Sequence, residues 1–192
     1  NILIAGGTST GKTTLANALL AEIAATGDRV LVLEDTIELQ CAARDHVPLR
    51  TQQGVVSMTE LVRSSMRLRP DRVVVGEVRG AEALDLIKVW GTGHPGGIAT
   101  IHAGSALGAL LRLEQLILEV AVNPPRALIA EAVNVVIHIA GRGRKRRIES
   151  IARVVGFDGV GYRLADAMDA PFPELPPLPD AAPAAATSPS LD

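Results

Sequence analysis

The chain has 192 residues, 47% of them apolar and 2% aromatic, so it is long enough for one sizeable core, built mainly from aliphatic side chains, and wholesale disorder is excluded. The net charge of −2 argues neither for nor against a nucleic-acid partner. The single Cys41 cannot form an internal disulfide, which favours a reducing, cytosolic compartment, and neither a signal peptide nor an apolar run of about eighteen residues is present.

The amino-terminal half alternates short apolar runs with segments of helical periodicity. Strands are predicted at 2–5, 29–34 and 72–76. Helices are predicted at 12–25, 58–68 and 80–90, and Ser57 with Glu60 forms a capping-box pattern before the second of them. No regular element is predicted between 39 and 56. Because Asn1 leads directly into a strand, we also expect that a further amino-terminal part belongs to the protein.

The same alternation continues in the second half of the chain. The predicted elements, in order, are a strand at 98–102, helices at 105–121 and 126–133, a strand at 135–139, and a hairpin of strands 148–155 and 160–164. Strands that alternate with helices predict an α/β domain over 1–166, with a mainly parallel, twisted sheet flanked by helices and a small carboxyl-terminal hairpin. Residues 167–192 hold most of the prolines among Ala, Ser and Asp, which is typical of a disordered tail.

A phosphate-binding loop stands between the first strand and the first helix. Gly6, Gly11, Lys12 and Thr13 satisfy the pattern GxxxxGK(S/T). Its glycines let successive N–H groups point at phosphate oxygens, the helix adds its positive end, and the lysine adds a full charge. We therefore expect a bound nucleotide, taken to be ATP, and Mg²⁺ on the Thr13 hydroxyl. The predicted nucleotide-binding residues of this loop are Gly6, Gly7, Thr8, Ser9, Thr10, Gly11, Lys12, Thr13 and Thr14.

Carboxylates follow two further strands and therefore belong to the same edge of a parallel sheet as the loop. The first group is Glu34, Asp35 and Glu38, and the second is Glu77 after the apolar run 73–75. Hydrolysis needs carboxylates to hold Mg²⁺ through its waters and to orient the attacking water. We expect Glu77 to lie near the metal and Glu38 to polarise the water. For Glu34 and Asp35, solvated loop charges are an equally good interpretation.

One histidine and one arginine are further catalytic candidates. His102 follows a predicted strand, so we expect it at the same sheet edge, where it can hydrogen-bond a γ-phosphate or relay its loss. Arg79, two residues beyond Glu77, is the best candidate among many arginines for a phosphate sensor across a subunit boundary. The basic run 142–147 is a candidate for contacts with phosphates or acidic lipid, although a charged turn is usually only solvated.

Four segments in this order resemble the secretion-ATPase superfamily of type II, type IV and pilus systems: GGTSTGKT, VLEDTIEL, RLRPDRVVVGEVRG and TGHPGGIATIHA. They correspond to its Walker A, Asp-box, Walker B and His-box elements, over about residues 1–164. The stretch EDTIELQCAARDHV is most similar to the conjugal-transfer branch, the TrbB-like proteins. The tetracysteine metal motif of some type II members is missing.

The resemblance implies a RecA-like domain of a hexameric ring, with ATP at subunit boundaries and a separate amino-terminal domain that closes over it. It implies an ATPase at the cytoplasmic face of the inner membrane that powers pilus assembly or substrate transfer together with membrane-bound apparatus proteins. By position, the family's catalytic glutamate falls on Glu38, its Walker B glutamate on Glu77, and its histidines on His94 and His102. His94 is accordingly expected at the nucleotide.

Several functions other than a conjugal-transfer motor stay open. A type II secretion or type IV pilus motor carries the same motifs. A small-molecule P-loop kinase is less favoured, because strand-end carboxylates favour water as the acceptor. A nucleic-acid translocase that uses the basic run 142–147 would be stimulated by single-stranded DNA in a salt-sensitive way. The remaining alternative is a scaffold that binds ATP without hydrolysing it.

Overall fold

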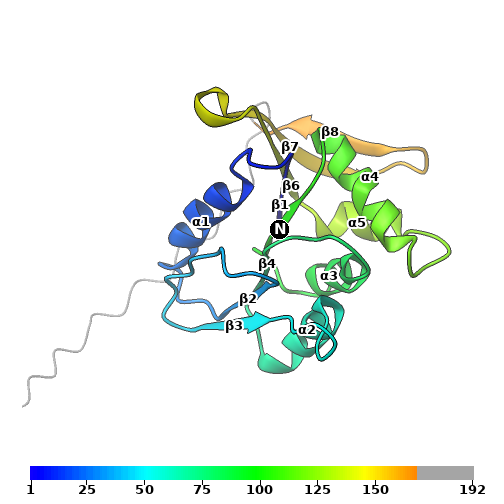
Figure 1. The fold of residues 1–192 in the computed structure, drawn as a ribbon. Helices are drawn as coiled ribbons and strands as arrows, with labels where there is room; N and C mark the ends of the chain where they lie inside the picture. The colour runs from blue at the N-terminus through cyan, green and yellow to red at the C-terminus, as the bar shows by residue number, and fades with distance from the viewer. Residues whose placement is uncertain (168–192) are drawn as a thin grey trace, which may run out of the picture.

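The structure, a computed structural model, describes residues 1–167, and a single mixed sheet organises them. Within these residues eight strands lie in the order β3-β2-β4-β5-β1-β6-β7-β8 (Figure 1). The first six in that order run parallel, and β7 and β8 are antiparallel to their neighbours. The strands are β1 Ile2–Gly6, β2 Val30–Glu34, β3 His46–Arg50, β4 Arg72–Val75, β5 Ile98–Ile101, β6 Val135–Ala140, β7 Arg147–Phe157 and β8 Tyr162–Asp166.

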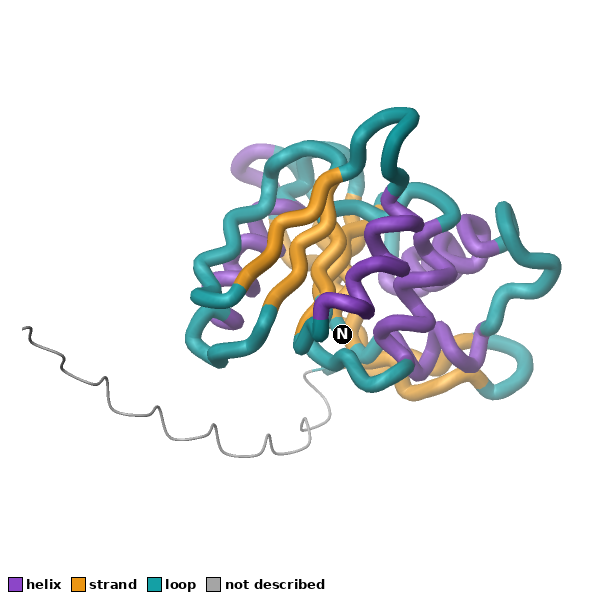
Figure 2. Tube along the Cα trace, turned by 90° about the horizontal axis from the view of Figure 1, so that it is seen from below, coloured by secondary structure: helices purple, strands orange, loops and turns teal. Residues whose placement is uncertain are grey.

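The helices divide unequally between the two faces of this sheet. Side chains of α1 pack with Ile4, Val32 and Val74 in one buried cluster, whereas α2 to α5 pack with Leu3, Leu33 and their neighbours in the other. Successive residues of a strand point to opposite faces, so fully buried strands such as β1 and β2 serve both clusters. Figure 1 shows α1 on one side and the other helices opposite, and Figure 2 shows the strands side by side through the middle. The α-helices are α1 Lys12–Ile23, α2 Met58–Ser65, α3 Glu82–Gly91, α4 Ala106–Ile117 and α5 Arg126–Ala132, and the 3₁₀ helices are η1 Met66–Leu68 and η2 Gly143–Lys145.

The predicted α/β class with a mainly parallel sheet is confirmed, and most element bounds differ by only a few residues. Strand β3 is the exception, because it lies inside the stretch 39–56 for which no regular structure was predicted. It pairs in parallel with β2 only and alternates between half-buried and exposed residues. Pro48 weakens its strand signal, yet a proline is tolerated here because an edge strand leaves one row of N–H groups unpaired.

The predicted carboxyl-terminal hairpin is present as β7 and β8, but it is not a separate appendage. Strand β7 pairs along β6, so the hairpin extends the main sheet at its edge. The predicted disordered tail, 167–192, lies outside the described residues apart from Ala167, and the boundary at 166 stays a prediction.

The parallel order matters for function because it aligns the strand ends. The loops after β1, β2, β4 and β5 all leave from the carboxyl edge of the sheet, and so does the turn after β6. In open α/β sheets ligands bind at this edge, where neighbouring loops diverge. The predicted phosphate loop and both carboxylate groups are thereby placed on one side of the molecule.

Candidate active site

The loop between β1 and α1 has the backbone of a phosphate cradle. Ser9 and Gly11 have positive φ angles of 62° and 100°, and Gly11 is the residue directly before α1. Gly6 sits so close to its surroundings that an added Cβ would lie 2.5 Å from Thr10 Oγ1 and 2.8 Å from the Ile139 carbonyl oxygen. A glycine is therefore required at position 6 by contact, and at position 11 by conformation.

The side chain of Lys12 folds back over this loop. Its Nζ donates to the carbonyl oxygens of Gly6, at 3.1 Å, and Gly7, at 3.2 Å, and the residue is only 8% exposed. Burial lowers the pKa of the Lys12 ammonium below its ordinary value; Glu77 opposes that shift, and Arg79 adds to it. A buried ammonium that lacks an anion of its own gains when one arrives, so the loop is prepared for a phosphate group.

Glu34 fixes the loop that carries Glu38. The Glu34 carboxylate is 4% exposed, and its Oε1 accepts hydrogen bonds from the backbone N–H groups of Glu38, at 3.0 Å, and Leu39, at 2.8 Å. Asn17 of α1 holds the same loop from the other side through the Glu38 carbonyl oxygen, at 3.2 Å. The Glu38 side chain then receives the Thr13 hydroxyl at 2.9 Å from its Oε2. The Thr13 hydroxyl, which was predicted to hold the metal, thus has Glu38 beside it and not Glu77.

A second cluster of polar side chains is formed by Glu77, which follows β4, and His102, which follows β5. His102 Nε2 lies 2.6 Å from Glu77 Oε1 and 3.5 Å from Lys12 Nζ, so one ring nitrogen faces both a carboxylate and an ammonium. Which of these two it bonds depends on whether Nε2 carries a proton. The histidine therefore links the lysine of the predicted phosphate loop to the carboxylate that follows the neighbouring strand.

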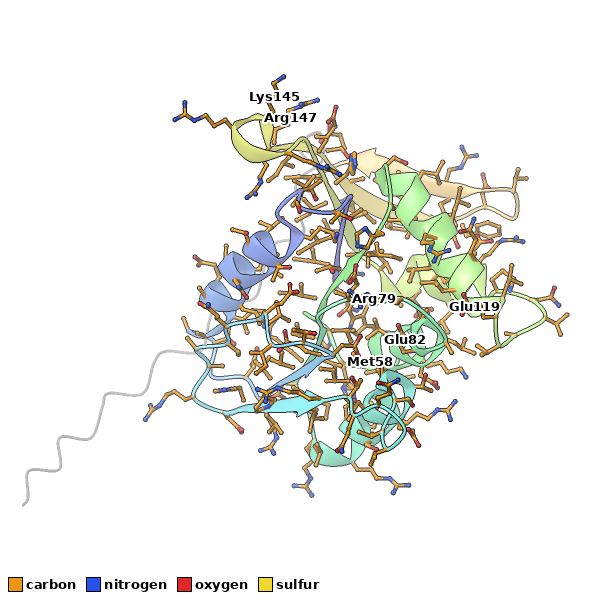
Figure 3. The ribbon with its side chains drawn as sticks, viewed as in Figure 1. Met58, Arg79, Glu82, Glu119, Lys145 and Arg147 are labelled. Carbon is orange, nitrogen blue, oxygen red and sulfur yellow. The ribbon has the colours of Figure 1, made fainter. Side chains whose placement is uncertain are left out.

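Arg79 is engaged within its own chain. Its Nε donates to Glu77 Oε2 at 2.6 Å, and its Nη1 lies 3.7 Å from Asp35 Oδ2. Glu82 shapes the turn, because its Oε1 accepts from the Arg79 N–H at 2.6 Å; both residues are marked in Figure 3. In this structure Arg79 neutralises acids of the site, and it is not presented as a free cation toward a neighbouring subunit. Its predicted role across a subunit boundary stays a prediction.

These groups surround one cavity of about 450 Å³, within the size range of small-molecule sites. Most of the predicted site residues line it. The lining residues are Thr8, Ser9, Thr10, Gly11, Lys12, Thr13, Thr14, Glu34, Asp35, Thr36, Glu38, Leu39, Gly76, Glu77, Arg79, Thr100, His102 and Arg146. Gly6 and Gly7 are not in the lining and instead supply the carbonyl groups that hold Lys12.

The structure does not bring His94 to this cavity. His94 lies in the loop before β5, beside the amino end of β1, since Ile98 pairs with Ile2. The phosphate loop follows the carboxyl end of β1, so the length of that strand, roughly 15 Å, separates the two. The expectation that His94 contacts the nucleotide of its own chain is therefore corrected. Its Nε2 is buried and has no hydrogen-bond partner among residues 1–167.

Among the lining residues that were not assigned to the site from the sequence, Glu34 and Arg146 are the two charged groups with a clear place in it. Glu34 was left undecided between a site residue and a solvated charge, and its buried bonds to the Glu38 loop make it a positioning residue. Arg146 was treated only as one member of a basic run, yet it lines the cavity. The sequence could not have assigned Arg146 to the site, because its place there depends on the pairing of β6, the strand before it, with β1.

The family model described as "Type II/IV secretion system protein" matches residues 1–148. The chain belongs to the type II/IV secretion system protein family. Its phosphate loop, both carboxylate groups and His102 all lie within the matched residues. No helix among residues 1–167 is both long and apolar enough to cross a membrane.

The relatives of this family member include conjugation and secretion proteins. It is 50% identical over 165 residues to the conjugal transfer protein TrbB of Rhizobium radiobacter, covering 85% of this chain and 51% of that protein. It is 38% identical to the type IV secretion system protein PtlH of Bordetella pertussis, covering 78% and 49%. The chain thus spans about half the length of these relatives.

Solved structures agree with the fold. The VirB11 ATPase of the Brucella suis type IV secretion system, in complex with sulphate, matches with a TM-score of 0.72 and 34% identity over 79% of this chain and 47% of that one. The pilus retraction motor PilT matches with a TM-score of 0.60 and 22% identity over 85% and 45%. The predicted RecA-like fold is confirmed.

Proposed function

We propose that this chain is the ATP-hydrolysing part of a conjugal-transfer or type IV secretion motor. The observation that carries the proposal is that one cavity joins a phosphate cradle to two carboxylates on different strands: Glu38 hydrogen-bonded to Thr13, and Glu77 in contact with His102. The relatives that are conjugal transfer and type IV secretion proteins support the biological setting.

The residues present suit Mg²⁺ as the partner of the nucleotide. The Thr13 hydroxyl and the Glu38 carboxylate lie 2.9 Å apart and are hard oxygen ligands. Among residues 1–167 no group of three or more His, Cys, Asp or Glu side chains is placed to hold a metal. That fits Mg²⁺, which takes one or two protein oxygens and completes its shell with water and phosphate oxygens. When bound, the ion would neutralise charge on the β- and γ-phosphates.

In the proposed reaction, water attacks the γ-phosphorus and the bond to the β–γ bridging oxygen breaks, which yields ADP and phosphate. Lys12 exchanges its bonds to loop carbonyl groups for bonds to phosphate oxygens, and this exchange offsets the cost of its burial. Glu38 orients the attacking water and accepts its proton. His102, between Lys12 and Glu77, senses whether the γ-phosphate is present, because Lys12 then bonds to phosphate oxygens and leaves the shared ring nitrogen to Glu77.

The assembly is also part of the proposal. The cavity is open in this chain, and a closed catalytic site excludes water, so a second domain and a neighbouring subunit of a hexameric ring would complete it. The matched part of this chain spans only about half the length of these relatives, which leaves room for such a domain. We place the motor at the cytoplasmic face of the inner membrane, where its partners would be the membrane-bound proteins of the transfer apparatus.

The test is phosphate release by the full-length protein with ATP and Mg²⁺ and no other acceptor. We expect multiple turnovers, and we expect Lys12→Ala to lose binding or turnover because the phosphates lose their buried cation. A small-molecule kinase would release little phosphate without its acceptor, and a scaffold would bind ATP without releasing any. Native mass spectrometry of the same sample measures the oligomer. Unchanged turnover in Lys12→Ala would remove the central claim.

A further inference from the structure

Arg146 is the one cation of the cavity that has no partner among residues 1–167. Lys12 is held by loop carbonyl groups, and Arg79 is paired with Glu77 and Asp35. The Arg146 side chain lines the same cavity without a hydrogen bond or ion pair to any described residue. The adjacent Arg147, in contrast, is bound to Glu149 at 2.9 Å.

The turn between β6 and β7 directs Arg146 toward the phosphate loop. A Cβ built on Gly11 would lie 3.6 Å from Arg146 Cδ and 3.8 Å from its Nη1, so the side chain lies against the start of α1. The turn starts beside the loop because β6 pairs with β1 in parallel, with Ile139 opposite Gly6. Lys145 and Arg147, which flank Arg146, mark this turn at the edge of the molecule in Figure 3.

Gly141 makes the return of this turn possible. Its φ angle is +80°, and a Cβ there would lie only 2.1 Å from the Lys145 carbonyl oxygen. A side chain at position 141 must therefore move the 3₁₀ helix η2, and with it Arg146, whose N–H donates to the Gly143 carbonyl oxygen at 3.3 Å. The placement of Arg146 thus depends on a close backbone contact within its own turn.

Arg146 and the catalytic carboxylates lie on opposite sides of the phosphate loop. In the sheet, β2, β4 and β5 stand on one side of β1 and bring Glu38, Glu77 and His102, whereas β6 stands on the other side and brings Arg146. The carboxylates mark where the terminal phosphate is cleaved. The part of the nucleotide beside Arg146 is therefore the part that ATP and ADP share.

We propose that Arg146 is a nucleotide-binding residue that donates hydrogen bonds to the phosphates common to ATP and ADP. This inference rests on the proposed function, because it assigns a ligand group within the same site. A guanidinium suits the task since it presents several donors in a fixed plane and stays charged, and bonds to phosphate oxygens are charge-assisted. Its role is in holding nucleotide before and after cleavage, not in the cleavage step.

The experiment measures dissociation constants for ADP and for a non-hydrolysable ATP analogue by calorimetry, for the full-length protein and its variants. Arg146→Ala is expected to weaken the binding of ADP and of the ATP analogue by the same factor, about tenfold, which is the lower end for a charge-assisted bond, because the Arg146 side chain is exposed. Arg146→Lys, which keeps the charge, is expected to recover part of the affinity, and Arg144→Ala is the matched control, an exposed arginine of the same turn outside the cavity.

Gly141→Ala provides an independent check, because it displaces the turn that carries Arg146 without changing the arginine itself. It should weaken ADP about as much as Arg146→Ala, and the double variant should be no weaker than either single one. Unchanged ADP affinity in Arg146→Ala, or a loss confined to turnover, would overturn the inference. So would equal affinities for Arg146→Lys and Arg146→Ala, since that pattern would mean stacking or packing in place of phosphate binding. If the unaltered protein binds no ADP, the proposed function itself fails.

Discussion

Replacing Glu34 by alanine tests whether a buried carboxylate holds the loop that carries Glu38. The substitution removes Oε1, which accepts two backbone N–H groups, from Glu38 at 3.0 Å and Leu39 at 2.8 Å. Hydrogen bonds to charged groups contribute about 1.5–3 kcal/mol each, so the pair is worth roughly 3–6 kcal/mol. Because Glu34 borders the cavity, water can enter the vacated space, and we expect the lower end, about 3 kcal/mol. That is a large fraction of the stability of a typical domain.

Urea unfolding followed by the fluorescence of Trp90 measures this loss. Trp90 is the single tryptophan of the chain and is buried at 4% exposure, so its emission reports on the domain core. The matched variant Glu34→Gln keeps a carbonyl oxygen for the two N–H groups and should lose only about 1 kcal/mol. Turnover should fall with the alanine variant, since Glu38 loses its support. A loss below about 1 kcal/mol together with full turnover would refute the positioning role of Glu34.

Two further substitutions separate the binding of the nucleotide from its cleavage. Glu38→Gln keeps an acceptor for the Thr13 hydroxyl but removes the negative charge. ATP should therefore still bind in calorimetry, while phosphate release should fall by about 10²-fold or more. Full turnover would exclude Glu38 as the residue that activates water. Gly6→Ala places a methyl group 2.5 Å from Thr10 Oγ1 and 2.8 Å from the Ile139 carbonyl oxygen, so nucleotide binding should be lost. The control Gly161→Ala, where no described atom lies within 4 Å of the added methyl group, should bind normally. Normal ADP affinity in Gly6→Ala would show that the loop tolerates the displacement.

The sequence was sufficient for whatever depends on local pattern. The phosphate loop needs glycines, a lysine and a threonine at fixed spacing between a strand and a helix, and these are contiguous in the chain. Glu38, Glu77 and His102 were identified because parallel strands end at a common edge, so a residue after an apolar run already has a position in space. The capping box of Ser57 and Glu60 is equally local and is present in the structure.

The sequence was insufficient where the position of a residue depends on strand order and on contacts between distant segments. His94 is four residues before β5, and only the pairing of Ile98 with Ile2 shows that it lies at the wrong end of the sheet for its own chain's nucleotide. Strand β3 was missed because an exposed edge strand with a proline has neither a continuous apolar run nor clear alternation.

The charged residues of the site show most clearly what the sequence determined and what the tertiary structure decided. The sequence by itself determined that the phosphate loop, the carboxylates and several arginines belong to this chain. Only the tertiary structure decided that Arg79 is neutralised by Glu77, that Glu34 is buried to hold Glu38, and that Arg146, beside Gly11, has no partner among residues 1–167. Charges interact strongly only over a few ångströms, and residues that meet within that distance, such as Gly11 and Arg146, lie more than a hundred positions apart in the chain.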